Sequence, residues 1–136
     1  MKKTLAALLV LAACSTSVHA AKTKFKLIHV DDLAKAMDSK TPPAVYDANV
    51  KALRKEIGIV PGAKLLSSSS KFDVAKELPA DKSTPLVFYC ANQQCMASHE
   101  AAKRAGKAGY TDVSVMADGI MGWQKAGKPL EKVAGS

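Results

Sequence analysis

Short apolar runs alternate along the chain with longer segments in which apolar residues recur at helical spacing. The clearest run, Leu86–Tyr89, contains four consecutive apolar residues, which is typical of a strand covered on both faces of a sheet. The following stretch, Met96–Lys107, carries alanines at helical spacing and predicts a helix that can approach a sheet closely. This alternation predicts an α/β fold, a parallel central sheet with helices on both faces. Further strands are predicted at 25–28, 44–46, 64–66 and 113–115, and further helices after an N-cap at Asp31 and at 50–57, 72–78 and 120–125.

The first twenty residues are expected to be an export signal. Two lysines precede the apolar stretch Leu5–Ala13, and Val18–Ala20 fits the pattern that a signal peptidase reads. A second interpretation overlaps the first, because Leu11–Cys14 is similar to a bacterial lipobox, in which Cys14 would carry the lipid. We therefore expect a signal peptide over 1–20, or a lipoprotein signal to residue 13. The domain at 21–136 would then be exported to the periplasm, either soluble or held by a lipid anchor.

Composition limits the class of protein. The chain has 136 residues, of which 48% are hydrophobic and 24% charged, and this predicts one compact domain with a core of its own. Three cysteines are too few for a small disulfide scaffold. The formal net charge is +8, but the cations are spread over predicted helices and turns without interleaved aromatic residues. A nucleic-acid groove would need clustered cations with stacking aromatics, so we expect no nucleic-acid partner.

The candidate chemistry lies at Cys90, which directly follows the Leu86–Tyr89 strand. In an open α/β sheet, ligands bind beyond the carboxyl ends of the strands. The loop that follows is short enough for its backbone amides to form an anion-binding nest, and the next helix adds its positive end. Both effects favour a thiolate, although an inert buried cysteine is the alternative from position alone. The amides concerned belong to Ala91, Asn92, Gln93, Gln94, Cys95 and Met96.

Five short motifs, in this order and spacing, resemble those of the single-domain rhodaneses, a family of sulfurtransferases. They are Val45–Asp47, a strand ending in the family's Asp; Gly58–Ala63, similar to its Gly-His-Ile-Pro-Gly-Ala segment with Ile59 in place of the His; the six-residue loop Cys90–Cys95; and two late glycine-containing signatures, Gly109–Val113 and Gly119–Trp123. The resemblance covers about 25–129 and implies a rhodanese-like domain.

The resemblance also implies a reaction. Cys90 would take a sulfane sulfur from a small donor as a persulfide, stabilised by the loop amides, and pass it to a thiol or to cyanide. No cofactor or metal is implied, and we expect a monomer. The loop ends in Cys95, where many rhodaneses have Arg or a hydroxyl residue, and it contains no Lys or Arg that would select a donor. For the same reason phosphate-ester hydrolysis is not expected.

The sequence also suggests roles for three residues outside the loop. Asp47 either supports the site from the end of its strand or only forms a turn. Arg54 is expected to make a surface salt bridge, and its alternative role is to replace the cation that the family commonly has where this chain has Asn49. Trp123 is expected to pack in the core.

Cys95 supports a competing hypothesis from a different class. In an oxidising compartment, a second cysteine beside a reactive one can act as a resolving thiol. The protein would then be a thiol-redox module, or a non-catalytic rhodanese module, that uses a reversible Cys90–Cys95 disulfide. Alternatively, Cys95 only packs at the helix start. A soft-metal site formed with His99 matches no strong zinc pattern, and His99 is expected to be a solvated helix residue.

Overall fold

The computed structural model describes residues 24–134. The predicted signal segment, with its cleavage site and Cys14, lies outside these residues and stays a prediction. Among the helices of residues 24–134, none combines the length and the apolar character needed to cross a membrane.

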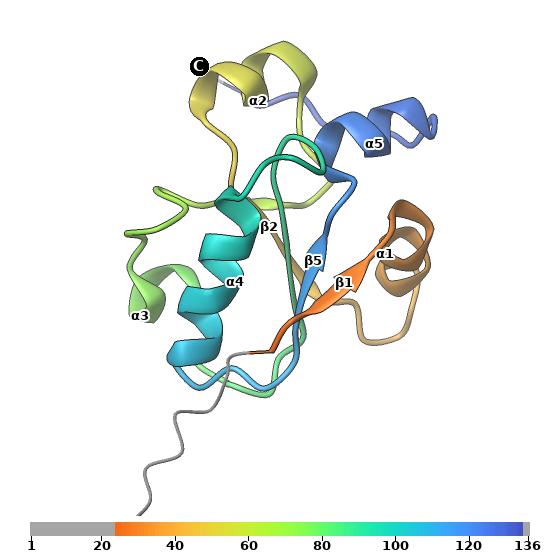
Figure 1. The fold of residues 1–136 in the computed structure, drawn as a ribbon. Coiled ribbons are helices and arrows are strands. Elements are labelled where there is room, and N and C mark those ends of the chain that lie inside the picture. The colour runs from red at the N-terminus through yellow and green to blue at the C-terminus, as the bar shows by residue number, and fades with distance from the viewer. Residues whose placement is uncertain (1–23, 135–136) are drawn as a thin grey trace, which may run out of the picture.

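A five-stranded parallel sheet forms the centre of the fold (Figure 1). The order β1-β5-β4-β2-β3 places β4 in the middle, where both neighbours cover its edges. All five predicted strands are confirmed, each to within one residue at either end. The strands are β1 (Lys26–Ile28), β2 (Ala44–Asp47), β3 (Lys64–Leu65), β4 (Leu86–Tyr89) and β5 (Val113–Met116).

Five helices surround the sheet, and two of them begin two residues away from the predicted start, whereas the other three begin within one residue of it. At α1 the N-cap is His29 rather than Asp31, and the Asp32 carboxylate accepts a hydrogen bond of 2.9 Å from the His29 amide. Helix α3 is shorter than the predicted 72–78, because Phe72 is fully buried and Asp73 caps the helix after it. The helices are α1 (Val30–Met37), α2 (Lys51–Ile57), α3 (Val74–Glu77), α4 (Ala97–Lys107) and α5 (Gly119–Lys125).

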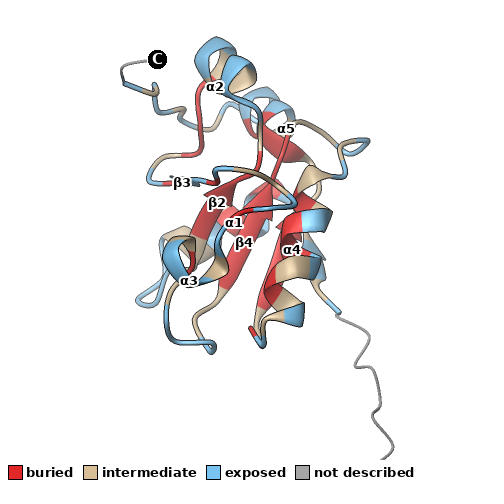
Figure 2. Cartoon of the chain, turned by 90° about the vertical axis from the view of Figure 1, so that its left-hand side faces the viewer, coloured by how far each residue is buried: buried red, intermediate tan, exposed pale blue. Residues whose placement is uncertain are grey.

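The sheet separates two apolar clusters, as the fold prediction requires. Helices α3 and α4 cover one face, and α1, α5 and the inner side of α2 cover the other (Figure 1). Because side chains alternate along a strand, Phe88 points into the first cluster and Tyr89 into the second. Burial follows the same layers, with the inner strands β2, β4 and β5 largely buried and the edge strands and outer helix surfaces largely exposed (Figure 2). Trp123 is 2% exposed in the second cluster, which confirms its predicted core position.

Candidate active site

Cys90 directly follows β4, the central strand, at its carboxyl end. Its side chain continues the alternation of the strand and points into the cluster between the sheet and α4. Only 1% of the residue is exposed. The predicted position at the carboxyl end of a central strand is therefore confirmed, but the sulfur is covered rather than open to solvent.

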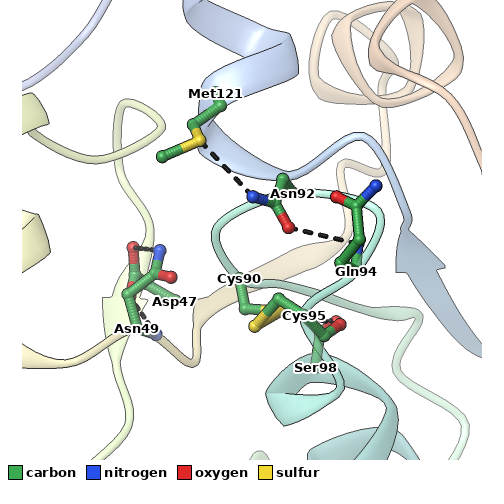
Figure 3. Close-up of a disulfide and its surroundings, with 8 residues drawn as sticks. All are labelled: Asp47, Asn49, Cys90, Asn92, Gln94, Cys95, Ser98 and Met121. Atoms are coloured by element: carbon green, nitrogen blue, oxygen red, sulfur yellow. Dashed lines mark hydrogen bonds between the residues drawn. A yellow bond between two sulfur atoms is a disulfide. The ribbon is translucent and has the colours of Figure 1, made fainter.

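Cys95 covers it, and the two cysteines form a disulfide (Figure 3). Their Cα atoms are 6.3 Å apart, within the usual range for a disulfide. Cys95 is only partly buried, and Met96, which follows it, is the N-cap of α4 and is 53% exposed. Of the roles considered for Cys95, the structure thus favours pairing with Cys90.

Besides the Cys95 sulfur, two oxygen atoms lie close to the Cys90 sulfur. The Ser98 hydroxyl oxygen lies 3.2 Å away and the Cys95 carbonyl oxygen 3.3 Å away. Ser98 is 1% exposed on the first turn of α4, on the same helix face as Ala101 and Ala105. Ser98 was not predicted from the sequence. The available signal was its spacing of three and seven residues from these alanines, which places a hydroxyl on the sheet-facing stripe.

The loop amides do not surround the sulfur in this form. The Gln94 amide donates to Asn92 Oδ1 and the Cys95 amide donates to the Asn92 carbonyl oxygen, both at 3.1 Å. Within the described chain, no hydrogen bond joins an amide of 91–96 to Cys90 Sγ. The expected amide nest is therefore absent from the disulfide form, and Asn92 instead organises a tight turn that returns Cys95 to Cys90.

Helix α5 fixes the base of the loop. The amides of Ile120 and Met121 donate to the carbonyl oxygens of Cys90 and Ala91, at 2.8 and 3.0 Å. A side chain at Gly119 would lie 2.5 Å from the Ala91 carbonyl, and Gly119 also has φ of +67°. Only glycine permits this close approach and this backbone conformation together.

Side chains of the loop make further contacts with α5 and the residue before it. Asn92 Nδ2 lies 3.6 Å from Met121 Sδ (Figure 3). Gln93 Nε2 donates a hydrogen bond of 3.1 Å to Asp118. Burial alone would raise the pKa of Asp118, but hydrogen bonds from Gln93, His29 and Val30 hold this pKa below its usual range. Asp118 is therefore ionised at neutral pH and anchors Gln93. A hollow of about 550 Å³ lies beside these residues.

Asp47 forms a buried ion pair with Arg54, which corrects the prediction of a surface salt bridge. Asp47 is fully buried, the Arg54 side chain is 11% exposed, and Nε lies 2.8 Å from Oδ1. Arg54 also donates to the carbonyl oxygens of Asp47 and Leu66, at 2.8 and 3.0 Å. The other hydrogen bonds of the carboxylate come from the Asn49 amide and side chain. Asp47 thus forms a turn and fixes α2, which favours the second of its two proposed roles.

His99 differs from its expected solvated position. Its ring packs edge-on against Phe25, with centroids 5.4 Å apart, and its Nδ1 is buried without a hydrogen-bond partner in residues 24–134. Over that same range, no three His, Cys, Asp or Glu side chains are grouped so that they could hold a metal ion. The structure therefore gives no support to the soft-metal alternative.

Comparison with known proteins gives one family and several solved structures. The family "Rhodanese-like domain" matches residues 29–126. A polysulfide-sulfur transferase homodimer from Wolinella succinogenes is 18% identical with a TM-score of 0.66, covering 81% of this chain and 80% of the other. A rhodanese-like domain protein from Staphylococcus aureus is 20% identical with a TM-score of 0.62, covering 81% and 100%. A thiosulfate sulfurtransferase from Pseudomonas aeruginosa is 20% identical with a TM-score of 0.65, covering 79% and 20%. No curated protein matches the chain.

Proposed function

Because the chain belongs to the rhodanese-like domain family, we propose that it is a sulfurtransferase with Cys90 as its nucleophile. The observation that carries the proposal is the position of Cys90. It lies at the carboxyl end of the central strand, at the start of a six-residue loop, with the Ser98 hydroxyl 3.2 Å from its sulfur. Two structurally similar proteins are named as sulfur transferases, which supports the reaction class.

The reaction begins from the reduced protein, because the disulfide occupies the Cys90 sulfur. The Cys90 thiolate attacks the outer sulfur of a small sulfane donor. A new bond forms between the two sulfurs, the donor's own bond to that sulfur breaks, and the rest of the donor leaves with the electron pair. An acceptor thiolate or cyanide then removes the outer sulfur and regenerates the thiolate. Ser98 is placed to donate a hydrogen bond to the charged sulfur in both steps.

The loop provides little that would select a dianionic donor. Residues 91–96 contain no Lys or Arg, and their polar side chains are the neutral amides of Asn92, Gln93 and Gln94. The donor is therefore assigned only as a small sulfane compound, and the acceptor as a thiol or cyanide. All residues in the scheme come from one chain, so we propose that a monomer carries it out without a cofactor. Export to the periplasm, soluble or lipid-anchored, is proposed from the N-terminal sequence pattern.

Intact-mass measurement tests the proposal. Reduced, desalted protein is incubated with thiosulfate and, in parallel, with inorganic polysulfide. We expect the Cys95→Ser variant to gain one sulfur atom that cyanide removes. A Cys90→Ser variant serves as the comparison and is expected to gain none. Equal cyanide-labile sulfur on both variants would refute the assignment of Cys90.

The disulfide favours a second candidate function, a thiol-redox module that exchanges electrons with other dithiols. Such a module would cycle between dithiol and disulfide in a glutathione buffer but would take up no sulfur when reduced. The sulfur-uptake measurement on Cys95→Ser therefore separates the two functions.

A further inference from the structure

We propose that Cys95 is a resolving thiol that discharges the Cys90 persulfide as hydrogen sulfide and leaves the disulfide seen in the structure. The inference rests on the Cys90 persulfide proposed above. It adds a product, sulfide, that the protein would form without any external acceptor. It also adds a requirement for a dithiol reductant that returns the site to its starting state.

The loop is built to bring the two sulfurs together. Cys90 is fixed by β4 and by the hydrogen bond from the Ile120 amide to its carbonyl oxygen. Cys95 lies directly before Met96, the N-cap of α4. The Asn92 side chain and carbonyl group close the turn between Cys90 and Cys95. Because both cysteines are held at the ends of regular elements, the second thiol faces the first at a high effective concentration. The intramolecular reaction would thus compete with any acceptor from solution.

The chemistry of the discharge balances without a further reagent. The Cys95 thiolate attacks the inner sulfur of the persulfide, which is Cys90 Sγ, and the bond between the two Sγ atoms forms. The outer sulfur is protonated before it leaves, so that when the bond from Cys90 Sγ to it breaks, it departs with the electron pair and its proton as hydrosulfide. The sulfane sulfur is reduced by two electrons, and the two cysteine thiols supply them by becoming a disulfide.

Burial determines which cysteine the reductant attacks. Cys90 is 1% exposed, whereas Cys95 is only partly buried. The first thiolate of a dithiol reductant therefore forms its mixed disulfide with Cys95, and Cys90 leaves as a thiolate beside the Ser98 hydroxyl, 3.2 Å away. The second thiol of the reductant then attacks the mixed disulfide, which frees Cys95 and oxidises the reductant.

A single-turnover experiment tests the proposal. Reduced, desalted wild-type protein and Cys95→Ser are incubated with thiosulfate, and separately with inorganic polysulfide, without added thiol or cyanide. Protein-free incubations correct for sulfide that polysulfide releases by itself. We expect the wild type to release about one sulfide per chain and to become lighter by two hydrogens. Cys95→Ser is expected to keep one added sulfur and to release no sulfide.

The alternatives give different results. If the wild type retains its added sulfur as Cys95→Ser does, the discharge by Cys95 is refuted and the sulfurtransferase proposal stands. If neither protein takes up sulfur, both proposals fail.

A second measurement quenches the oxidised protein with N-ethylmaleimide during reduction by cysteamine and maps the adducts. We expect cysteamine on Cys95 and the maleimide on Cys90, and the reverse pattern would contradict the assigned direction of attack.

Discussion

The Ser98 hydroxyl oxygen lies 3.2 Å from the Cys90 sulfur, and both residues are 1% exposed. The loop contains no cation, and in the disulfide form no amide of 91–96 donates a hydrogen bond to the Cys90 sulfur among the described residues. Ser98 thus provides the side-chain hydrogen-bond donor nearest to the Cys90 sulfur when this thiol becomes an anion. A neutral hydroxyl stabilises a buried anion without the cost of burying a second charge.

Ser98→Ala should therefore slow sulfur uptake by the reduced protein. A hydrogen bond to a charged group contributes about 1.5–3 kcal/mol, which predicts a rate lower by about 10-fold to 150-fold. The rate is measured from the growth of the sulfur adduct in intact-mass spectra of the reduced protein. Ser114→Ala is the matched control, since Ser114 is a buried serine of β5 that is 8% exposed. Equal rates for Ser98→Ala and Ser114→Ala would remove Ser98 from the mechanism.

Activity should depend on prior reduction, because the disulfide both occupies and covers the Cys90 sulfur. Wild-type protein purified without reductant is expected to transfer no sulfur until a dithiol is added. Cys95→Ser cannot form this disulfide and should be active without such pretreatment. The initial rate of thiocyanate formation from thiosulfate and cyanide measures both. Full activity of unreduced wild type, with its disulfide confirmed by mass, would show that the bond does not block the site.

Much of the site could be predicted from the sequence, because it follows from the strand pattern. The apolar run before Cys90 identifies a central strand, and parallel topology places the residue at the carboxyl edge. Ser98 could not be placed in the same way. Its contact with Cys90 depends on how α4 is rotated about its own axis relative to β4. The turn between them, which Asn92 organises, sets this rotation.

The Asp47–Arg54 pair illustrates a second limit of sequence analysis. Seven residues separate the two side chains, and nothing in that spacing shows whether water reaches the guanidinium. Its burial arises because Arg54 also binds the Leu66 carbonyl oxygen, which belongs to the segment after β3. The N-cap of α1 shows a related limit, since Asp31 is a suitable capping residue by type, but the helix begins earlier, with His29 as its N-cap and the Asp32 carboxylate bound to the His29 amide.

Arg54→Ala should destabilise the fold strongly. The substitution leaves the fully buried Asp47 carboxylate without its cation, and breaking a buried pair in this way costs about 3–5 kcal/mol. Urea unfolding of the reduced protein measures the change in the free energy of unfolding. Lys55→Ala, at the exposed neighbouring position on α2, is the control and should lie within about 0.5 kcal/mol of wild type. Similar losses for the two variants would mean that the pair contributes no more than a surface charge.

Replacement of Gly119 should be damaging because a side chain there would collide with the loop. Gly127 separates this effect from the cost of the backbone conformation alone. Both Gly119 and Gly127 have positive φ, +67° and +70°, so alanine at either position incurs the left-handed backbone penalty of about 1–2 kcal/mol. At Gly127 a new Cβ meets nothing within 4 Å, whereas at Gly119 it lies 2.5 Å from the Ala91 carbonyl group. Gly119→Ala must therefore also displace the base of the loop, so it should lower both stability and the rate of sulfur uptake. Gly127→Ala should lower stability alone. Urea unfolding and single-turnover uptake measure the two effects, and an unchanged uptake rate in Gly119→Ala would show that α5 does not position the loop.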